Sequence, residues 1–575
     1  MNWIKRHEWW VVGALACVAA VLGYAGIATY YAAIGVQASS LDIVYGVFQL
    51  FRVANPVSAE GVASLVAPNA LVQIARFLAP ATIAYSLIRL VATAIGDAAR
   101  KISLTGMEGH AVVCGLTDRG LTIAQSLLAN GQSVVVIDPE AENSRFGDVK
   151  TVGAKTLVGS LLDETVLKRA RIYGARSLAV MTEDERTNFA VAGKCAELAE
   201  RYRRKTRQRE PLLIRAHASQ DFADVFGEVA PFGFANNVAD AQFFDAMKTA
   251  ARRVALDVSA AYAAAIVSET SKPRLLVIGD NRFTAALLGM TLRQMQFPGC
   301  SVPAIDVVSP NLETVLESFP RAHPQLDLVG SVRFYERSHG QLLSDEFDLV
   351  DPSSGRKYDI VIAALDDPFA NIRLGRKLTQ LAGDAAGAKA HAQGDMKVIV
   401  CIKPTSGLYG VDEYLAGDRY GHLFNLTELG CCSEAVFDEA LDVEAKKAHE
   451  SYLKQLGESD RDPAKPATAP WSILSEEYKA ANRRTIDHDC IKSLFLDLDS
   501  SIKMTNDLSE AEHRSWMADR ILAGWRFGAE RDDSKKLHPS LIPYAELSQA
   551  EKDKDIEKVR RIAYKGESNA ATSCL

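Results

Sequence analysis

The sequence lacks the residue patterns of several common protein classes. Its nine cysteines include no Cys-x-x-Cys pair, and the close pair Cys431 and Cys432 is adjacent in the chain, a poor arrangement for a zinc site or a disulfide scaffold. The net charge of -7 gives no general positive field to hold a polyanion, although residues 201–209 are locally basic. We therefore expect no metal site, no nucleic-acid partner, and a soluble part that is cytosolic and reduced.

Charged residues are scarce before position 96, where the sequence has two long apolar stretches. The first, residues 9–35, carries no charge, and at about 1.5 Å of rise per residue it crosses a hydrocarbon layer of about 30 Å. The alternative, a signal peptide, has a shorter apolar core of roughly 7 to 15 residues. The second, residues 71–96, carries Arg76 and Arg89, which we expect to face away from lipid because a charge inside the bilayer is costly.

Positive charges flank these two predicted spans. Lys5 and Arg6 precede the first span, and Arg100 and Lys101 follow the second. The positive-inside rule therefore places both termini in the cytoplasm. Residues 1–105 are expected to form the membrane domain of a multi-pass protein of the inner (plasma) membrane.

A third apolar segment, residues 41–53, lies between the spans but is about half as long as a bilayer requires. Half-length segments of this kind are commonly re-entrant, which makes this one a candidate pore lining. The alternative is an amphipathic helix on the outer membrane surface. The candidate pore residues are Tyr45, Gln49, Phe51, Arg52 and Asn55.

A glycine turn follows the second span closely, in the segment Gly109-His-Ala-Val-Val-Cys-Gly-Leu-Thr-Asp-Arg-Gly120. An apolar strand, this turn, a helix at 121–130 and a second strand at 133–138 are typical of a doubly wound parallel sheet. Gly115 and Gly120 allow backbone amides to approach a pyrophosphate, while Thr117 replaces the middle glycine of the usual motif. Asp138 ends the second strand, where a carboxylate can accept ribose hydroxyls; the alternative is a solvated strand end.

Residues 158–163 and 177–188 are similar to two conserved stretches of the RCK (TrkA-N) family, although Ser160 stands where that family usually has aspartate. Two spans, a half-helix and a nucleotide fold together resemble the two-span potassium channels with cytoplasmic RCK domains. The resemblance implies that residues 106–272 bind NAD(H) or an adenine nucleotide as a regulator. The residues it places at that site are Gly115, Thr117, Arg119, Gly120, Asp138, Thr182, Asp184 and Asn188.

A crossover helix at 243–265 is expected to pack one lobe on its neighbour, most naturally in a dimer, and a second, weaker copy of the fold follows at 273–456. The copy keeps Gly279 in its first turn, and its second strand is expected to end at Asp306. Asp280 would put a negative charge where a phosphate should lie, so we expect this copy to be mainly structural. Two copies per chain in a homotetramer would match the gating rings of the channels that the sequence resembles.

The potassium-selectivity sequence of those channels, Thr-Val-Gly-Tyr-Gly, is absent. This chain has Gln49-Leu-Phe-Arg-Val-Ala-Asn55 at that place, so the sequence supports no particular ion.

The proline-punctuated segment 457–470 is expected to be a linker, and residues 471–565 resemble the RyR repeat of ryanodine receptors. The resemblance is carried by residues 511–532, 537–544 and 551–555, and it implies a module that senses nucleotide-derived signals. Aromatic side chains could stack on a base while basic ones hold a phosphate; the alternative is that the tryptophans are core and the basic residues a solvated loop. The candidates are His513, Trp516, Trp525, Phe527, Arg531, Lys535, His538 and Tyr544.

The expected fold is a membrane α-helical hairpin with a re-entrant segment, two α/β Rossmann-like RCK domains and a small, mainly α RyR domain. The expected function is a homotetrameric ion channel gated by nucleotide, with ions, the nucleotide and membrane lipid as partners. The alternative is a non-conducting, membrane-tethered nucleotide sensor or defence effector. An enzyme is not expected, because no acid–base residue accompanies either glycine turn at a recognisable spacing.

Overall fold

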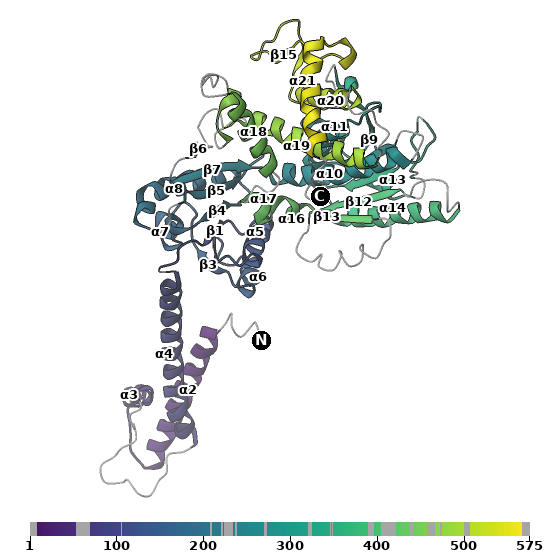
Figure 1. The fold of residues 1–575 in the computed structure, drawn as a ribbon. Coiled ribbons are helices and arrows are strands. Elements are labelled where there is room, and N and C mark those ends of the chain that lie inside the picture. The colour runs from purple at the N-terminus through teal and green to yellow at the C-terminus, as the bar shows by residue number, and fades with distance from the viewer. Residues whose placement is uncertain are drawn as a thin grey trace. The chain divides into compact units, whose positions relative to one another are not determined.

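The computed structural model forms two compact units, Met1–Gly106 and Met107–Leu575 (Figure 1). It describes the chain apart from residues 1–7, 53–69, 105, 207–209, 220–221, 223–233, 236–237, 269–272, 320–324, 345–346, 348, 353, 389–395, 404–420, 438–441, 457–465, 472–473, 499–505 and 566–575. The candidate pore residue Asn55 therefore lies outside the described residues, as does most of the predicted linker.

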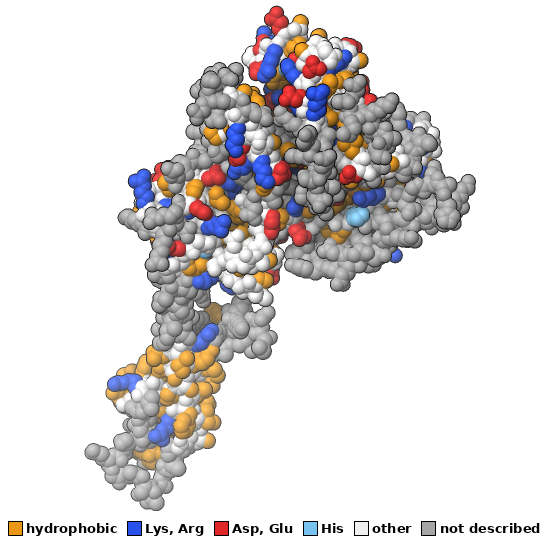
Figure 2. Space-filling view, viewed as in Figure 1, with side chains coloured by type: hydrophobic (Ala, Val, Ile, Leu, Met, Phe, Trp, Pro, Cys, Tyr) orange, Lys and Arg blue, Asp and Glu red, His pale blue; other side chains and the backbone are white. Residues whose placement is uncertain are grey.

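The first unit is a hairpin of α2 (Glu8–Ala33) and α4 (Ala70–Leu104), with the short helix α3 (Ser40–Phe51) packed on both. Two stretches, Val12–Ala33 and Ala70–Arg89, are long and apolar enough to cross a membrane. Figure 2 shows that the described surface of this hairpin is mostly hydrophobic. Arg76 and Arg89 are both exposed.

Helix α3 begins with a capping box: the Ser39 hydroxyl accepts from the Asp42 amide, and the Asp42 carboxylate accepts from the Ser39 amide. One face of α3 is buried against the hairpin. Leu50 lies so close to α2 that a Cβ atom at Gly23 would be 2.8 Å from its Cδ1. The half-length apolar segment is therefore a helix packed on the two long helices, and it ends at Phe51, slightly earlier than the predicted end at residue 53.

A seven-stranded sheet with the order β3-β2-β1-β4-β5-β7-β6 opens the second unit, and its strands are parallel except for β6. The strands are β1 (Ala111–Cys114), β2 (Val134–Asp138), β3 (Lys155–Val158), β4 (Ser177–Val180), β5 (Leu212–His217), β6 (Phe234–Ala235) and β7 (Ala239–Phe244). The helices are α5 (Asp118–Ala129), α6 (Arg145–Thr151), α7 (Glu164–Arg169) and α8 (Glu185–Tyr202). The central strands β1, β2 and β4 are wholly buried, as a parallel sheet covered on both faces requires.

A second parallel sheet has the order β10-β9-β8-β11-β12-β13. Its strands are β8 (Arg274–Gly279), β9 (Ala304–Ser309), β10 (Ser331–Glu336), β11 (Ile360–Ala364), β12 (Lys397–Ile402) and β13 (Gly421–Asn425). Its helices are α11 (Arg282–Gln294), α12 (Leu312–Ser318), α13 (His339–Leu343), α14 (Pro368–Ala388) and α16 (Leu426–Cys431). The next helix, α17 (Ser433–Val436), contacts α5 of the first fold, and α18 (Val443–Leu456) packs on the C-terminal helix α19 (Glu476–Leu498). The strand expected to end at Asp306 continues to Ser309, which leaves Asp306 inside β9.

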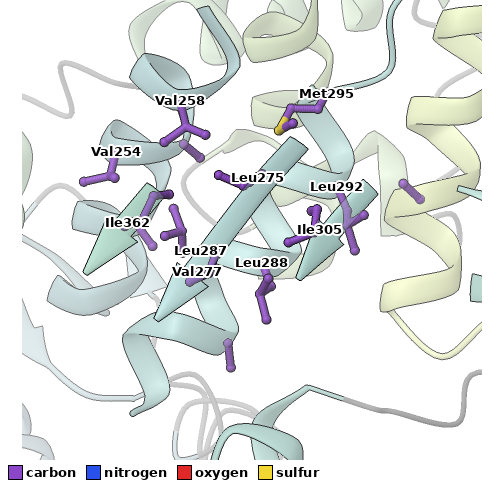
Figure 3. Close-up of a cluster of buried hydrophobic side chains, with 14 of the residues drawn as sticks. Val254, Val258, Leu275, Val277, Leu287, Leu288, Leu292, Met295, Ile305 and Ile362 are labelled. Atoms are coloured by element: carbon purple, nitrogen blue, oxygen red, sulfur yellow. The ribbon is translucent and has the colours of Figure 1, made fainter. Parts of the chain in front are cut away.

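Helix α10 (Ala246–Ser268) is the crossover helix, and it lies within the second unit rather than on its surface. Its alanines and valines enter the largest buried cluster, where Val254 and Val258 lie near Leu275 and Ile362 of the second sheet (Figure 3). The close approach extends to α16, because a Cβ atom at Gly430 would overlap the Ala246 carbonyl. Within this chain the helix packs on the second fold, and its use in a dimer stays a prediction.

The C-terminal module is mainly helical, as expected. It contains α19 (Glu476–Leu498), α20 (Asn506–Leu522) and α21 (Gln549–Lys565), with the two short strands β14 (Arg526–Phe527) and β15 (Leu537–His538). Residues of this module, including Phe495 and Met517, belong to the same buried cluster as α10 and the second sheet. The module therefore shares a hydrophobic core with the second fold.

The described cysteines correct one expectation. Seven of them are free thiols, but Cys490 is disulfide-bonded, so the prediction of a wholly reduced soluble part does not hold at that position.

Candidate functional site

The turn between β1 and α5 can be built only with glycine at two positions. Gly115 has a φ of +95°, and a Cβ atom there would lie 2.9 Å from the Thr182 amide nitrogen. A Cβ atom at Gly120 would overlap the Gly115 carbonyl oxygen. The backbone of the turn therefore passes close to β4 and to its own helix, which is the geometry that brings main-chain amides to a phosphate.

Thr117 explains why the middle glycine of the motif is absent. Its hydroxyl caps α5 by accepting from the Gly120 amide at 3.2 Å and donates to the Met181 carbonyl at 2.7 Å. Thr117 thus satisfies one helix-terminal amide and ties the turn to β4. The other backbone amides of the first turn of α5 lie at the helix N-terminus, where the helix dipole favours binding of an anion.

Asp138 is buried beside this turn, so it is not a solvated strand end. One carboxylate oxygen accepts from the Leu116 amide at 2.6 Å, and the other accepts from the Glu140 amide at 3.0 Å. Its side chain therefore fixes the turn to the end of β2. A carboxylate oxygen has capacity for more than one donor, so Asp138 can also accept from a ribose hydroxyl.

Three polar candidates lie after β4 and at the start of α8: Thr182, Asp184 and Asn188. Their polar groups are largely hydrogen-bonded within the protein. Asn188 is fully buried; its amide oxygen accepts from the Thr182 hydroxyl at 2.7 Å, and its amide nitrogen donates to the His217 carbonyl at 2.9 Å. Asp184 caps α8, and the Thr187 hydroxyl lowers the pKa of its carboxyl group. Asn188 and Asp184 therefore stabilise the segment between β4 and α8, and their direct contact with a ligand stays a prediction.

Arg119 brings a positive charge to the first turn of α5. One guanidinium nitrogen lies 2.6 Å from the exposed Glu183 carboxylate, while its Nε is buried without a partner. Burial, together with the nearby Arg119 charge, lowers the pKa of His217 to about 3. The Nδ1 atom of His217 is also buried and unpartnered. Sequence reasoning missed His217 and Glu183, although His217 ends β5 and Glu183 follows β4, and the carboxyl ends of these strands meet at this edge.

The corresponding turn of the second fold is filled by its own side chains. Asn281 caps α11 and donates to the Ala364 carbonyl at 2.9 Å, and Asp280 accepts from the Asp366 amide at 2.7 Å. Burial raises the pKa of the Asp280 carboxyl group. Ser309 occupies the strand end that corresponds to Asp138. These contacts support the interpretation that this turn does not hold a pyrophosphate.

Five of the eight C-terminal candidates meet in one aromatic group. The ring centroids of His513 and Trp516 are 5.5 Å apart, those of Trp516 and His538 are 5.0 Å apart, and Tyr544 lies 5.9 Å from His513. Trp525 lies 6.2 Å from His538, but it is buried and its indole nitrogen contacts Glu477 at 3.3 Å. Trp525 is thus a core residue, as the alternative interpretation held for the tryptophans.

The remaining three candidates lie outside this aromatic group in the contacts of the described residues. Phe527 is 52% exposed. Arg531 pairs with Asp533 at 2.7 Å and Lys535 with Asp532 at 3.1 Å, so both cations are neutralised locally. A ligand phosphate would have to displace these carboxylates.

Beneath the aromatic group, the module has a charged core. Glu512 is fully buried and contacts Lys492 at 2.7 Å, Arg484 at 3.2 Å and His488 at 3.2 Å. Burial alone would raise the pKa of Glu512, but the charges of Lys492 and Arg484 outweigh burial and hold it well below its usual range. The carboxylate therefore stays ionised, and the network joins α19 to α20.

The pore candidates differ in exposure. Tyr45 and Arg52 are exposed, and Gln49 and Phe51 are half-buried. Among the residues that the structure describes, no group of three or more His, Cys, Asp or Glu side chains is arranged to hold a metal ion.

Comparison with known families agrees with these features. Residues 111–221 match the TrkA-N domain, and residues 496–564 match the RyR domain. The chain carries a TrkA-N domain and a RyR domain. The first contains the glycine turn, Asp138 and His217, and the second contains the aromatic group.

Solved structures of GsuK are also similar. The crystal structure of GsuK bound to ADP is 14% identical, with a TM-score of 0.35, and the match covers 74% of this chain and 96% of that one. The GsuK channel bound to NAD is 11% identical, with a TM-score of 0.37, and the match covers 80% and 84%. The GsuK RCK domain is 12% identical, with a TM-score of 0.37, and the match covers 58% and 78%.

Proposed function

We propose that the protein is a ligand-gated ion channel of the inner membrane, in which a nucleotide bound at the first glycine turn shifts a closed–open equilibrium. The observation that carries the proposal is the turn itself: Gly115 and Gly120 lie where only glycine fits, and buried Asp138 lies beside them. Residues 105–110 alone separate α4 from β1, the strand that leads into this turn. Ligand-induced movement of β1 would therefore act directly on an apolar helix.

The arrangement favours NAD(H) or an adenine nucleotide as the ligand. Main-chain amides of α5 and the Arg119 guanidinium would bind phosphate, and Asp138 would accept from ribose hydroxyls. In this proposal the nucleotide is a regulator and is not consumed. It would shift the gating equilibrium only through a difference in affinity between the two states.

A homotetramer with cytoplasmic termini would place the hairpins around a central pathway. The exposed Arg76 side chain fits this assembly, since a second chain or water must cover its charge within a membrane. The gate would lie in α4 around residues 92–102, before the soluble unit begins. Ion selectivity stays open, because the potassium-selectivity sequence is absent.

The RyR domain would supply a second ligand input through α19, the helix that leads into it and that is bonded to the crossover helix. Arg252 of α10 makes two 2.7 Å hydrogen bonds to the Asp487 carboxylate of α19 and a third, also 2.7 Å, to Asp442. Both Arg252 and Asp487 are buried. A change in α19 would therefore reach α10, which follows the last strand of the TrkA-N sheet.

Planar-bilayer recording of the purified full-length chain tests the proposal. Addition of NAD(H) or ADP to the cytoplasmic side is expected to change the open probability, and Asp138→Ala is expected to displace the midpoint of that response. Ser309→Ala, at the corresponding strand end of the second fold, serves as the matched control. If nucleotide binds but leaves the ionic current unchanged, the proposal that nucleotide gates the channel is wrong.

The alternative is a non-conducting, membrane-tethered sensor or defence effector. It is favoured by one specific observation: Gln49-Leu-Phe-Arg-Val-Ala-Asn55 stands where a selectivity sequence would be expected. If the protein binds nucleotide but carries no ionic current in the bilayer under any ligand condition, this second function is supported.

A further inference from the structure

We infer that the second fold has a ligand pocket of its own, away from its filled glycine turn, for a small organic anion that carries an apolar ring. A pocket of about 310 Å³ lies against β8, β9 and β10 on one side and has Gln341, Phe347 and Tyr358 among the residues on the other. Its volume lies within the range of small-molecule sites. Nothing in the proposed nucleotide mechanism uses it.

One face of the second sheet supplies the floor. Val308 of β9 is paired with Tyr335 of β10, and Leu276 of β8 is paired with Asp306, so these side chains form two adjacent rows on the same face. Leu276 and Val308 are buried and apolar. Tyr335 and Phe347 are partly buried, and they add aromatic surface to the lining. The floor therefore suits a ring or a branched hydrocarbon.

A buried polar network holds the opposite wall in place. Arg333 bonds both oxygens of Asp306 at 2.7 Å and reaches Asp351 at 2.7 Å, while Arg274 also pairs with Asp351. Tyr358, which lines the pocket, donates its hydroxyl to Asp306 at 2.5 Å. Two carboxylates are thus balanced by two guanidinium groups, and the wall that carries Tyr358 is fixed before any ligand arrives.

Two cationic side chains outside this network lie near the pocket. Arg337 lines it directly; its guanidinium contacts the Glu336 carbonyl at 2.8 Å, and within the described part of the chain no carboxylate pairs with it. The Lys377 ammonium donates to the Ser344 carbonyl and lies 5.7 Å from the centre of the Phe347 ring, and no carboxylate of a described residue pairs with it. Because the buried carboxylates are already neutralised, Arg337 and Lys377 favour an anionic group on the ligand.

Equilibrium dialysis of the full-length chain with radiolabelled phenylacetate and phenyl phosphate tests the inference, with neutral phenylacetamide as the uncharged comparison. At least one anion is expected to bind saturably, with phenylacetamide at least tenfold weaker. Arg337→Gln, a change at an exposed side chain, is expected to weaken anion binding at least tenfold. Val308→Trp is expected to abolish it by filling the pocket.

Arg373→Gln is the matched control, because Arg373 is an exposed arginine on α14 of the same fold. It is expected to leave binding unchanged, and all variants should retain nucleotide binding at the first fold. The inference is wrong if neither anion binds saturably. It is also wrong if both anions bind the folded Arg337→Gln and Val308→Trp variants as tightly as they bind the wild type. Retained nucleotide binding in that case would leave the proposed function standing.

Discussion

The two Rossmann-like folds of this chain share a topology but differ at the place where a nucleotide would bind. Their first five strands have the same order, β3-β2-β1-β4-β5 in one and β10-β9-β8-β11-β12 in the other. The first fold leaves helix-terminal amides beside Gly115 and buried Asp138, whereas the second fills its turn with Asp280 and Asn281. A shared fold therefore does not imply a shared site, since a few residues at the strand ends decide it.

The largest expected effect is the loss of nucleotide binding in Gly120→Ala. The added methyl group would overlap the Gly115 carbonyl, so the turn must open and its amides lose their alignment. Isothermal titration with ADP or NAD is expected to show no saturable binding at the first fold. Gly193→Ala in α8 is the control, because its Cβ atom would meet nothing within 4 Å; it should stabilise the protein by about 0.5–1 kcal/mol.

Arg252→Met tests whether the second fold and the RyR domain support the first. It leaves Asp487 buried without its guanidinium partner, so the free energy of unfolding is expected to fall by about 3–5 kcal/mol. Chemical denaturation of the full-length chain measures the loss. The double variant Arg252→Met with Asp487→Leu should recover part of it. An unchanged unfolding curve in the single variant would show that this ion pair does not join the domains energetically.

Asp138→Ala compares the two strand ends directly. Removing a desolvated carboxylate that, in the proposed function, would accept from ribose hydroxyls is expected to cost roughly 1.5–3 kcal/mol, or at least tenfold in nucleotide affinity. Ser309→Ala, the corresponding change in the second fold, should leave the affinity unchanged. Equal affinities in the two variants and the wild type would remove Asp138 from the site.

His217 ends β5, whereas Ile402 ends the corresponding strand β12, and this difference predicts a pH dependence. Burial and the Arg119 charge lower the folded-state pKa of His217 to about 3, so the folded state binds fewer protons than the unfolded state below the ordinary histidine pKa of 6.5. Stability is therefore full above about pH 6.5 and falls toward pH 3, by up to about 1.4 kcal/mol per pH unit. His217→Leu should remove this part of the slope in thermal unfolding measured from pH 7 to pH 5.

Glu183→Gln should give the smallest change. Glu183 is exposed and pairs with the Arg119 guanidinium, so in the proposed function it would compete with a ligand phosphate. Surface ion pairs of this kind contribute about 0–1 kcal/mol. Nucleotide affinity is expected to rise about two- to fivefold. A decrease in affinity would show that Glu183 contacts the ligand rather than competing with it.

Local patterns were sufficient to predict much of this molecule. The apolar stretches and the alternation of strands, glycine turns and helices depend on neighbouring residues, so the hairpin, the two α/β folds and the helical C-terminal module could be expected. The proximity of Asp138 to the turn could be predicted for the same reason.

Contacts between distant residues could not be predicted in this way. Arg252 and Asp487 are 235 positions apart, and nothing near either residue indicates that they meet. Three other features depend on the same kind of tertiary contact. They are the burial of α10 in a shared core, the hydrogen bonding of the Asn188 side chain within the protein, and the closeness of Arg119 to His217. Asp306 was misplaced because an acidic residue in an apolar run suggests a strand end, whereas Arg333 and Tyr358 pair with it inside the sheet.

The most direct test is to determine the structure of the full-length protein in lipid with and without NAD or ADP. The account predicts one nucleotide per chain over Gly115 to Gly120, none at Gly279, and a displaced α4 in the nucleotide-bound protein. Nucleotide at the second turn, or membrane hairpins that superimpose in the two states, would contradict it.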